Sequence, residues 1–211
     1  MKANAGFCGW KYEQRSGSRT KVPKAATSRN ADISDPSDFC SFEEILNKAD
    51  EFDGIGIAVK GDLAAVDIDH SVVDGNLTEL ARSIVDKVRS YTEISPSGKG
   101  IRIIAKAPGF IYDREKYYIN NRKLGLEIYT SGGTKRFVTV TGNAVSDYFL
   151  RDISDVPEIL ETYMRRLEAQ KPENRIDAPS CFWTCMKKYG SRIMGERQEE
   201  TSEKGKNDQE G

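Results

Sequence analysis

The pattern that most constrains the fold is the amphipathic segment 76–90, which has strand-like segments on both sides. Its apolar residues recur at the spacing of one helical face, at Leu77, Leu80, Ala81, Ile84, Val85 and Val88. Asn76, followed by Glu79 three residues later, has the form of a capping box at the start of this helix. Strands are predicted over 54–59 and 63–69 before it, and over 91–94 and 101–107 after it. This order predicts an α+β fold with a mainly antiparallel sheet, helices on one face and the other face open for a ligand.

Three further elements complete the prediction. Ser41 with Glu44 has the capping-box spacing of a short helix. The segments 124–130 and 136–142 read as strands, and the turn SGGTK between them predicts a hairpin. The segment 155–170 is predicted to be a helix, with Asp155 as its cap and Pro157 in its first turn.

These elements suggest a division of the chain into regions. Residues 1–170 are predicted to form one domain, with an N-terminal α/β part (1–54) and a larger part (55–170). Residues 171–195 are expected to be a short helix or a linker. Residues 196–211 are almost wholly polar and charged, which predicts a disordered C-terminal tail.

Composition restricts the environment of the protein. No run of 18 apolar residues occurs and the N-terminus lacks an apolar leader, so neither a membrane span nor a secretory signal is expected. The four cysteines are scattered and the chain has one histidine, His70, which is typical of reduced thiols in a cytoplasmic protein and disfavours a zinc site. The net charge of −1 hides an acidic block at 31–79 between basic blocks, which could line a groove for a polyanion or simply be solvated faces.

The strand 63–69 ends in the sequence Asp67-Ile68-Asp69. Alternate residues of a strand share a face, so the two carboxylates lie on one side, roughly 7 Å apart along the strand. Their mutual repulsion is about 2 kcal/mol at an effective dielectric near 20, and a cation between them would convert that cost into affinity. Oxygen ligands of this kind suit Mg²⁺ or Mn²⁺. The alternative is a strand end with two solvated acids.

Three other stretches carry candidate binding residues. In SPSGKG, Ser97 and Lys99 could contact a phosphate, and Gly98 and Gly100 could let the backbone approach a ligand, although such a turn is often only a turn. Glu127 lies in mid-strand on the face of Gly125 and Tyr129, where it could be a third metal ligand or an exposed side chain. Two cations, Arg102 and Arg136, each near the start of a strand, could reach a triphosphate or lie on the surface.

The series VDIDH, SPSGKGIRI, LEIY resembles the three motifs of the archaeo-eukaryotic primase superfamily. It is most similar to the primase–polymerase domains of phage and plasmid replication proteins. The N-terminal segment is similar as well, with Trp10, the TKVP element and the helix start SFEE. The resemblance covers about residues 5–165.

The resemblance implies an RRM-like primase palm and a DNA-templated nucleotidyltransferase. Asp67, Asp69 and Glu127 would hold two Mg²⁺ or Mn²⁺ ions, one activating a 3′-hydroxyl and the other binding the incoming triphosphate. Ser97, Lys99, Arg102 and Arg136 would bind the nucleotide. The implied partners are a single-stranded DNA template, NTPs or dNTPs, and a replicative helicase in trans, in the cytoplasm of a bacterium or a phage-infected cell.

Arg102 stands where the family usually has a histidine. Arginine can bind phosphate but cannot donate a proton near neutral pH. A catalytically silent relative that binds DNA or nucleotide is therefore an alternative. A third is another D-x-D enzyme, such as a nuclease or a nucleotide-sugar transferase, although the later motifs speak against it.

Overall fold

The computed structural model describes residues 5–131, 133–146, 148–153 and 156–166. All of them belong to one compact unit, residues 1–166. The predictions for 171–195 and 196–211 lie outside the described residues, as does the predicted helix cap Asp155. None of the described helices is long and apolar enough to cross a membrane.

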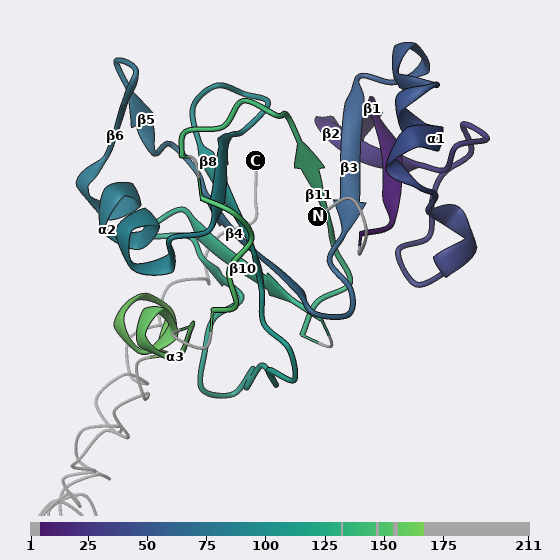
Figure 1. Cartoon of the computed structure of the whole chain (residues 1–211). Helices are drawn as coiled ribbons and strands as arrows, with labels where there is room; N and C mark the ends of the chain where they lie inside the picture. Colours follow the sequence, from purple (N-terminus) through teal and green to yellow (C-terminus); the bar gives the residue numbers. More distant parts are fainter. Residues whose placement is uncertain (1–4, 132, 147, 154–155, 167–211) are drawn as a thin grey trace, which may run out of the picture. The chain divides into compact units, whose positions relative to one another are not determined.

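The first sheet has four strands in the order β11-β3-β1-β2, and every neighbouring pair is antiparallel. Its strands are β1 (Phe7–Arg15), β2 (Ser18–Lys24), β3 (Gly54–Ala58) and β11 (Phe137–Val140). The short helix α1 (Phe42–Leu46) lies on the side of this sheet (Figure 1). Its predicted cap is confirmed, because Ser41 Oγ accepts a hydrogen bond from the Glu44 amide at 3.2 Å.

The second sheet has five strands in the order β7-β8-β4-β10-β9, again antiparallel throughout. They are β4 (Leu63–Ile68), β7 (Tyr91–Ile94), β8 (Ile101–Lys106), β9 (Asn120–Asn121) and β10 (Leu126–Thr130). A small ribbon of β5 (Val72–Val73) and β6 (Asn76–Leu77) leads into helix α2 (Glu79–Val88). Helix α3 (Val156–Ile159) continues into a π-helical turn, Leu160–Met164. The predicted mainly antiparallel β-structure is confirmed.

Helix α2 forms where the periodicity predicts it, and its buried side chains are Ala81, Ile84, Val85 and Val88. The predicted cap is wrong: Asn76 lies in β6, and the cap is Thr78, whose Oγ1 accepts a hydrogen bond from the Ala81 amide at 3.4 Å. Asn76 pairs with Val73 in the ribbon, which holds the chain extended until Thr78.

The predicted alternation along β4 is confirmed. Its even-numbered residues pack in one apolar core with α2, whereas Leu63 and Ala65 pack in a second core with residues of the first sheet. The sequence predicted that the face of the sheet opposite the helices would be open for a ligand. This prediction is wrong for part of the second sheet. Part of that face is covered by the first sheet, through contacts that include Ile104 and Tyr129.

The predicted hairpin of 124–130 with 136–142 is wrong. β10 pairs with β4 and β9 in the second sheet, whereas β11 pairs with β3 in the first. The connection between β10 and β11 therefore crosses from one sheet to the other. The sequence predicted one sheet, whereas the described residues form two main sheets, and β11 belongs to the first.

Candidate active site

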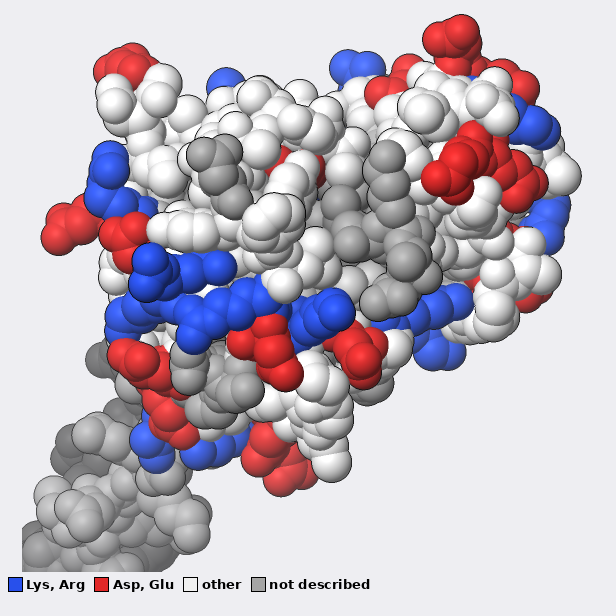
Figure 2. Space-filling view, viewed as in Figure 1, with Lys and Arg blue, Asp and Glu red and all other residues white. Residues whose placement is uncertain are grey.

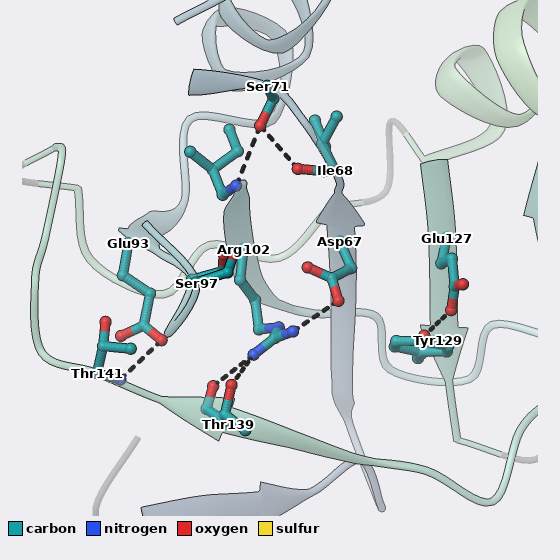
Figure 3. Close-up of polar contacts among 12 residues, drawn as sticks. Asp67, Ile68, Ser71, Glu93, Ser97, Arg102, Glu127, Tyr129, Thr139 and Thr141 are labelled. Carbon is teal, nitrogen blue, oxygen red and sulfur yellow. Dashed lines mark hydrogen bonds and ion pairs between the residues drawn. The ribbon is translucent and has the colours of Figure 1, made fainter. Parts of the chain in front are cut away.

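A row of polar side chains crosses the second sheet from β7 to β9, on the face that the first sheet partly covers. The register aligns Glu93 with Arg102, Arg102 with Asp67, Asp67 with Glu127, and Glu127 with Asn120. Paired positions on antiparallel neighbours point their side chains to the same face, with Cβ atoms about 5 Å apart. Two sequence-predicted ligands, Asp67 and Glu127, are thus direct neighbours although 60 residues separate them (Figure 3).

Arg102 lies in the middle of this row and is only 6% exposed. Its Nη2 donates to Asp67 Oδ2 at 2.6 Å, and its Nη1 donates to the carbonyl oxygen of Thr139 at 2.8 Å and to the hydroxyl of the same residue (Figure 3). The Nε atom is buried and has no partner among the described residues. Arg102 thus neutralises Asp67 and joins the second sheet to β11 of the first.

Glu127 faces two acidic neighbours. Burial raises the pKa of its carboxyl, and the charges of Asp67 and Asp69 raise it further, while Arg136 and Arg102 act in the opposite sense. Its side chain accepts hydrogen bonds from Asn120 and from the hydroxyl of Tyr129. The three carboxylates are therefore close enough to repel one another, which is the condition in which a bound cation is stabilising.

Asp69 follows β4 and is flanked by a glycine on each side. Its amide donates to the Gly125 carbonyl at 2.8 Å. A Cβ atom on Gly100 would lie 2.7 Å from the Ile68 oxygen and 3.4 Å from Asp69 Cα, and one on Gly125 would lie 3.4 Å from Asp69 Cβ. The sequence analysis expected Gly100 to let the backbone approach a ligand. In the structure, the atoms that approach Gly100 closely belong to the protein's own backbone at Ile68 and Asp69. Gly98 has a positive φ of 72° in open space, as a turn requires.

The exposed turn between β7 and β8 carries Ser97 and Lys99. Ser97 Oγ lies 3.0 Å from Ser95 Oγ and accepts from the Lys99 amide at 3.3 Å. Gly100, at the end of this turn, brings the turn beside Asp69. Arg136 lies on the side of Glu127. Its Cζ is 6.0 Å from the ring centre of Tyr129, whose hydroxyl donates to Glu127.

The sequence analysis missed two residues near the acids. Lys21 on β2 has a lowered pKa, because of burial and the charge of Arg102, while Asp67 and Asp69 oppose the shift. Glu93 is fully buried and accepts from the amides of Thr141 and Gly142 at 3.0 and 3.1 Å. No local pattern points to either, because their neighbours come from distant parts of the chain.

The donor chemistry of the carboxylates fits hard divalent cations, which prefer carboxylate oxygen. In the part of the chain that the structure describes, however, no three His, Cys, Asp or Glu side chains are grouped as a metal site. The hydrogen bonds explain this: Asp67 is bound to Arg102, and Glu127 to Tyr129 and Asn120. Binding an ion would require one or both side chains to turn.

The fold and the acids on adjacent strands, together with the motif series, are those expected of a primase–polymerase, and a comparison with known proteins supports membership of that family. The chain is 32% identical over 143 residues to the DNA Primase-polymerase of Nitratiruptor phage NrS-1. The match covers 63% of this chain but 18% of that protein, so the chain spans less than a fifth of its relative. No protein-family model matches. The predicted resemblance is thereby confirmed as a distant similarity.

Proposed function

We propose that this chain is a DNA-templated nucleotidyltransferase that makes primers, extends DNA, or does both. The observation that carries the proposal is the position of Glu127 directly opposite Asp67, with Asp69 directly after the end of β4. The similarity to the DNA Primase-polymerase of the phage supports it. The RRM-like palm implied by the motifs belongs to the same proposal.

Asp67, Asp69 and Glu127 would hold two Mg²⁺ or Mn²⁺ ions, as their oxygen donors and mutual repulsion favour. When bound, such ions supply activation of a 3′-hydroxyl and stabilisation of the charge on the phosphates. The 3′-oxygen would form a bond to the α-phosphorus while the bond from the α-phosphorus to the oxygen that bridges it to the β-phosphorus breaks, so that pyrophosphate leaves and the hydroxyl proton passes to solvent. The carboxylates themselves orient the reacting groups.

The nucleotide triphosphate would lie on the β7–β8 side of Asp69. Ser97 would donate its hydroxyl and Lys99 its charge to phosphate oxygens, and Arg136 would add a second cation beside Glu127. Arg102 would contribute permanent charge, although direct binding of a phosphate would require its guanidinium to leave Asp67 or Thr139. Lys21 is a further cation for the same triphosphate.

One observation favours a second candidate, a catalytically silent relative that binds DNA or nucleotide. The ion pair of Arg102 with Asp67, at 2.6 Å, already supplies a positive charge to an acid that an active enzyme needs for metal. If this pair persists when Mg²⁺ is added, the site would bind nucleotide without transferring it.

Synthesis on a single-stranded template separates the candidates. The protein is supplied with Mg²⁺ or Mn²⁺ and with NTPs or dNTPs, and new oligonucleotides are resolved on a gel. We expect product from the wild type and a loss of about 1,000-fold or more in Asp67→Ala and Asp69→Ala, because several kcal/mol of charge stabilisation disappear. Asp86→Ala, which removes an exposed acid from α2, is the matched control and should keep full activity.

The other outcomes reject this function. Tight binding of template without synthesis under either metal supports the silent relative, and degradation of the template indicates a nuclease. The comparison of NTPs with dNTPs also shows which sugar is preferred. A helicase acting in trans and a cytoplasmic location remain predictions.

A further inference from the structure

A cleft of about 400 Å³ lies beside Asp69, between the start of α2 and the turn that joins β9 to β10. Its floor includes Leu80 and Leu124, and its rim carries His70, Arg122 and Lys123. This volume is at the small end of the range of ligand pockets, roughly 300–1,000 Å³. The cleft therefore has room for one nucleotide-sized group rather than for a length of strand.

The charge of the cleft suits an anion. Arg122 and Lys123 are both exposed, and no carboxylate among the described residues forms an ion pair with either. Two neighbouring cations above an apolar floor match a phosphate attached to a sugar and a base. The His70 ring at the rim adds a surface on which a base can stack.

The cleft and the β7–β8 turn lie on opposite sides of Asp69. Asp69 lies between Gly100, which ends the β7–β8 turn, and Gly125, which follows the β9–β10 turn. The sheet order agrees, since β8 and β10 flank β4 on opposite sides. The turn with Ser97 and Lys99 and the turn with Arg122 and Lys123 thus lie on opposite sides of Asp69.

In-line phosphoryl transfer needs this separation, because the attacking oxygen and the leaving group are on opposite sides of the phosphorus. We infer that the cleft receives the 3′-terminal nucleotide of the strand being extended, with its phosphodiester on Arg122 and Lys123. This inference rests on the proposed function, which puts the triphosphate on the β7–β8 side. A single phosphodiester charge also suits two cations beside the acidic Asp69 better than a triphosphate does.

The inference can be tested by DNA binding without catalysis. A 5′-fluorescein single-stranded oligonucleotide is titrated in EDTA at several salt concentrations and followed by fluorescence anisotropy. For Arg122→Ala/Lys123→Ala we expect affinity to fall about ten-fold or more, and the slope of log K against log salt to decrease by about 0.7, because one neutralised phosphate is lost. Arg82→Ala/Lys116→Ala removes two exposed charges elsewhere and should bind as the wild type.

A second measurement locates the strand end. An oligonucleotide with photoreactive 4-thiothymidine as its 3′-terminal nucleotide should crosslink to residues 68–70 or 122–125, and the crosslink should disappear in the double variant. dNTP binding with Mg²⁺, measured by calorimetry, should be unchanged in that variant.

Each alternative outcome overturns the inference. DNA affinity equal to that of the control variant, or crosslinks only elsewhere, would show that the strand end does not use the cleft. Loss of dNTP binding with DNA binding intact would make the cleft a triphosphate site. A wild type that crosslinks in the cleft but makes no product would reject the proposed function and leave the strand site standing.

Discussion

The two faces of the second sheet differ in what their side chains do. Toward α2, the residues of β4, β8 and β10 are apolar and fully buried, among them Ile68, Ile103 and Leu126. On the other face, a row with Ile104 and Ala65 packs against the first sheet. The next row, which contains Arg102 and Asp67, is charged. Arg102 in this charged row is still buried and contacts Thr139 of β11.

This difference shows how one small sheet can be both stable and reactive. One face and part of the other supply burial, so the remaining part can hold acids that would be costly in a core. Buried charges are tolerated there because they are paired or hydrogen-bonded, as Arg102 and Glu93 are. Figure 2 shows that Lys and Arg also gather in a band on one face of the surface, with some Asp and Glu directly below it and others in a separate group at the upper right.

The largest effect on stability is expected on the apolar face. Ile103→Ala should lower the free energy of unfolding by about 3 kcal/mol, because Ile103 is fully buried against α2 and its truncation leaves a cavity. Ile111→Ala is the matched control: its side chain is 88% exposed, and the change should be below about 0.5 kcal/mol. Urea unfolding followed by circular dichroism measures both. Equal losses would mean that the two-faced description of the sheet is wrong.

Breaking the central ion pair should cost less. Arg102→Ala should destabilise by about 2 kcal/mol, since it leaves Asp67 and the Thr139 carbonyl without their partner. It should also raise the KM for nucleotide, and an unchanged KM would remove Arg102 from the binding site.

The double variant Arg102→Met/Asp67→Leu replaces the ion pair with two apolar side chains, as on the apolar face of the sheet. It should be more stable than Arg102→Ala, and a double variant no better than the single would contradict this.

Glu93→Gln tests the hydrogen bonds at the end of the row. Both carboxylate oxygens accept backbone amides, from Thr141 and Gly142, and a glutamine amide nitrogen cannot replace one of them. We expect a loss of about 1 kcal/mol in urea unfolding. Glu115→Gln changes an exposed residue in the same way and should have no effect. Equal stability of the two variants would show that Glu93 does not anchor this loop.

The smallest effect concerns pH. The pKa of Glu127 is raised in the folded state, so ionising it opposes folding. The penalty is absent below the unfolded pKa, develops as pH rises through the folded pKa, and is complete above it. In EDTA, Glu127→Gln should therefore be more stable than the wild type at about pH 8, by less than about 1 kcal/mol, and equal to it near about pH 4. A wild type that is the more stable at high pH would contradict the repulsion among the acids.

The local elements were predictable because their signals lie within a few residues. Helix α2 follows from its periodicity, α1 from its cap, and the two faces of β4 from alternation. The shared face of Asp67 and Asp69 stays a prediction, because β4 ends at Ile68 and Asp69 lies in the turn that follows. The strands with which β10 and β11 pair were not predictable. The alternation of apolar residues in a strand indicates which face is buried, but not which strand lies beside it.

By itself, the sequence therefore determined helices α1 and α2, the strands β3, β4, β7, β8, β10 and β11, the acids at the end of β4 and the motif series that points to a primase–polymerase. It did not predict β1 and β2, which form half of the first sheet. Only the tertiary structure decided that β11 joins the first sheet, that Arg102 pairs with Asp67, and that Lys21 from β2 lies near the acids. Those contacts depend on sheet order and register, which arise when segments far apart in the chain bury their apolar faces together.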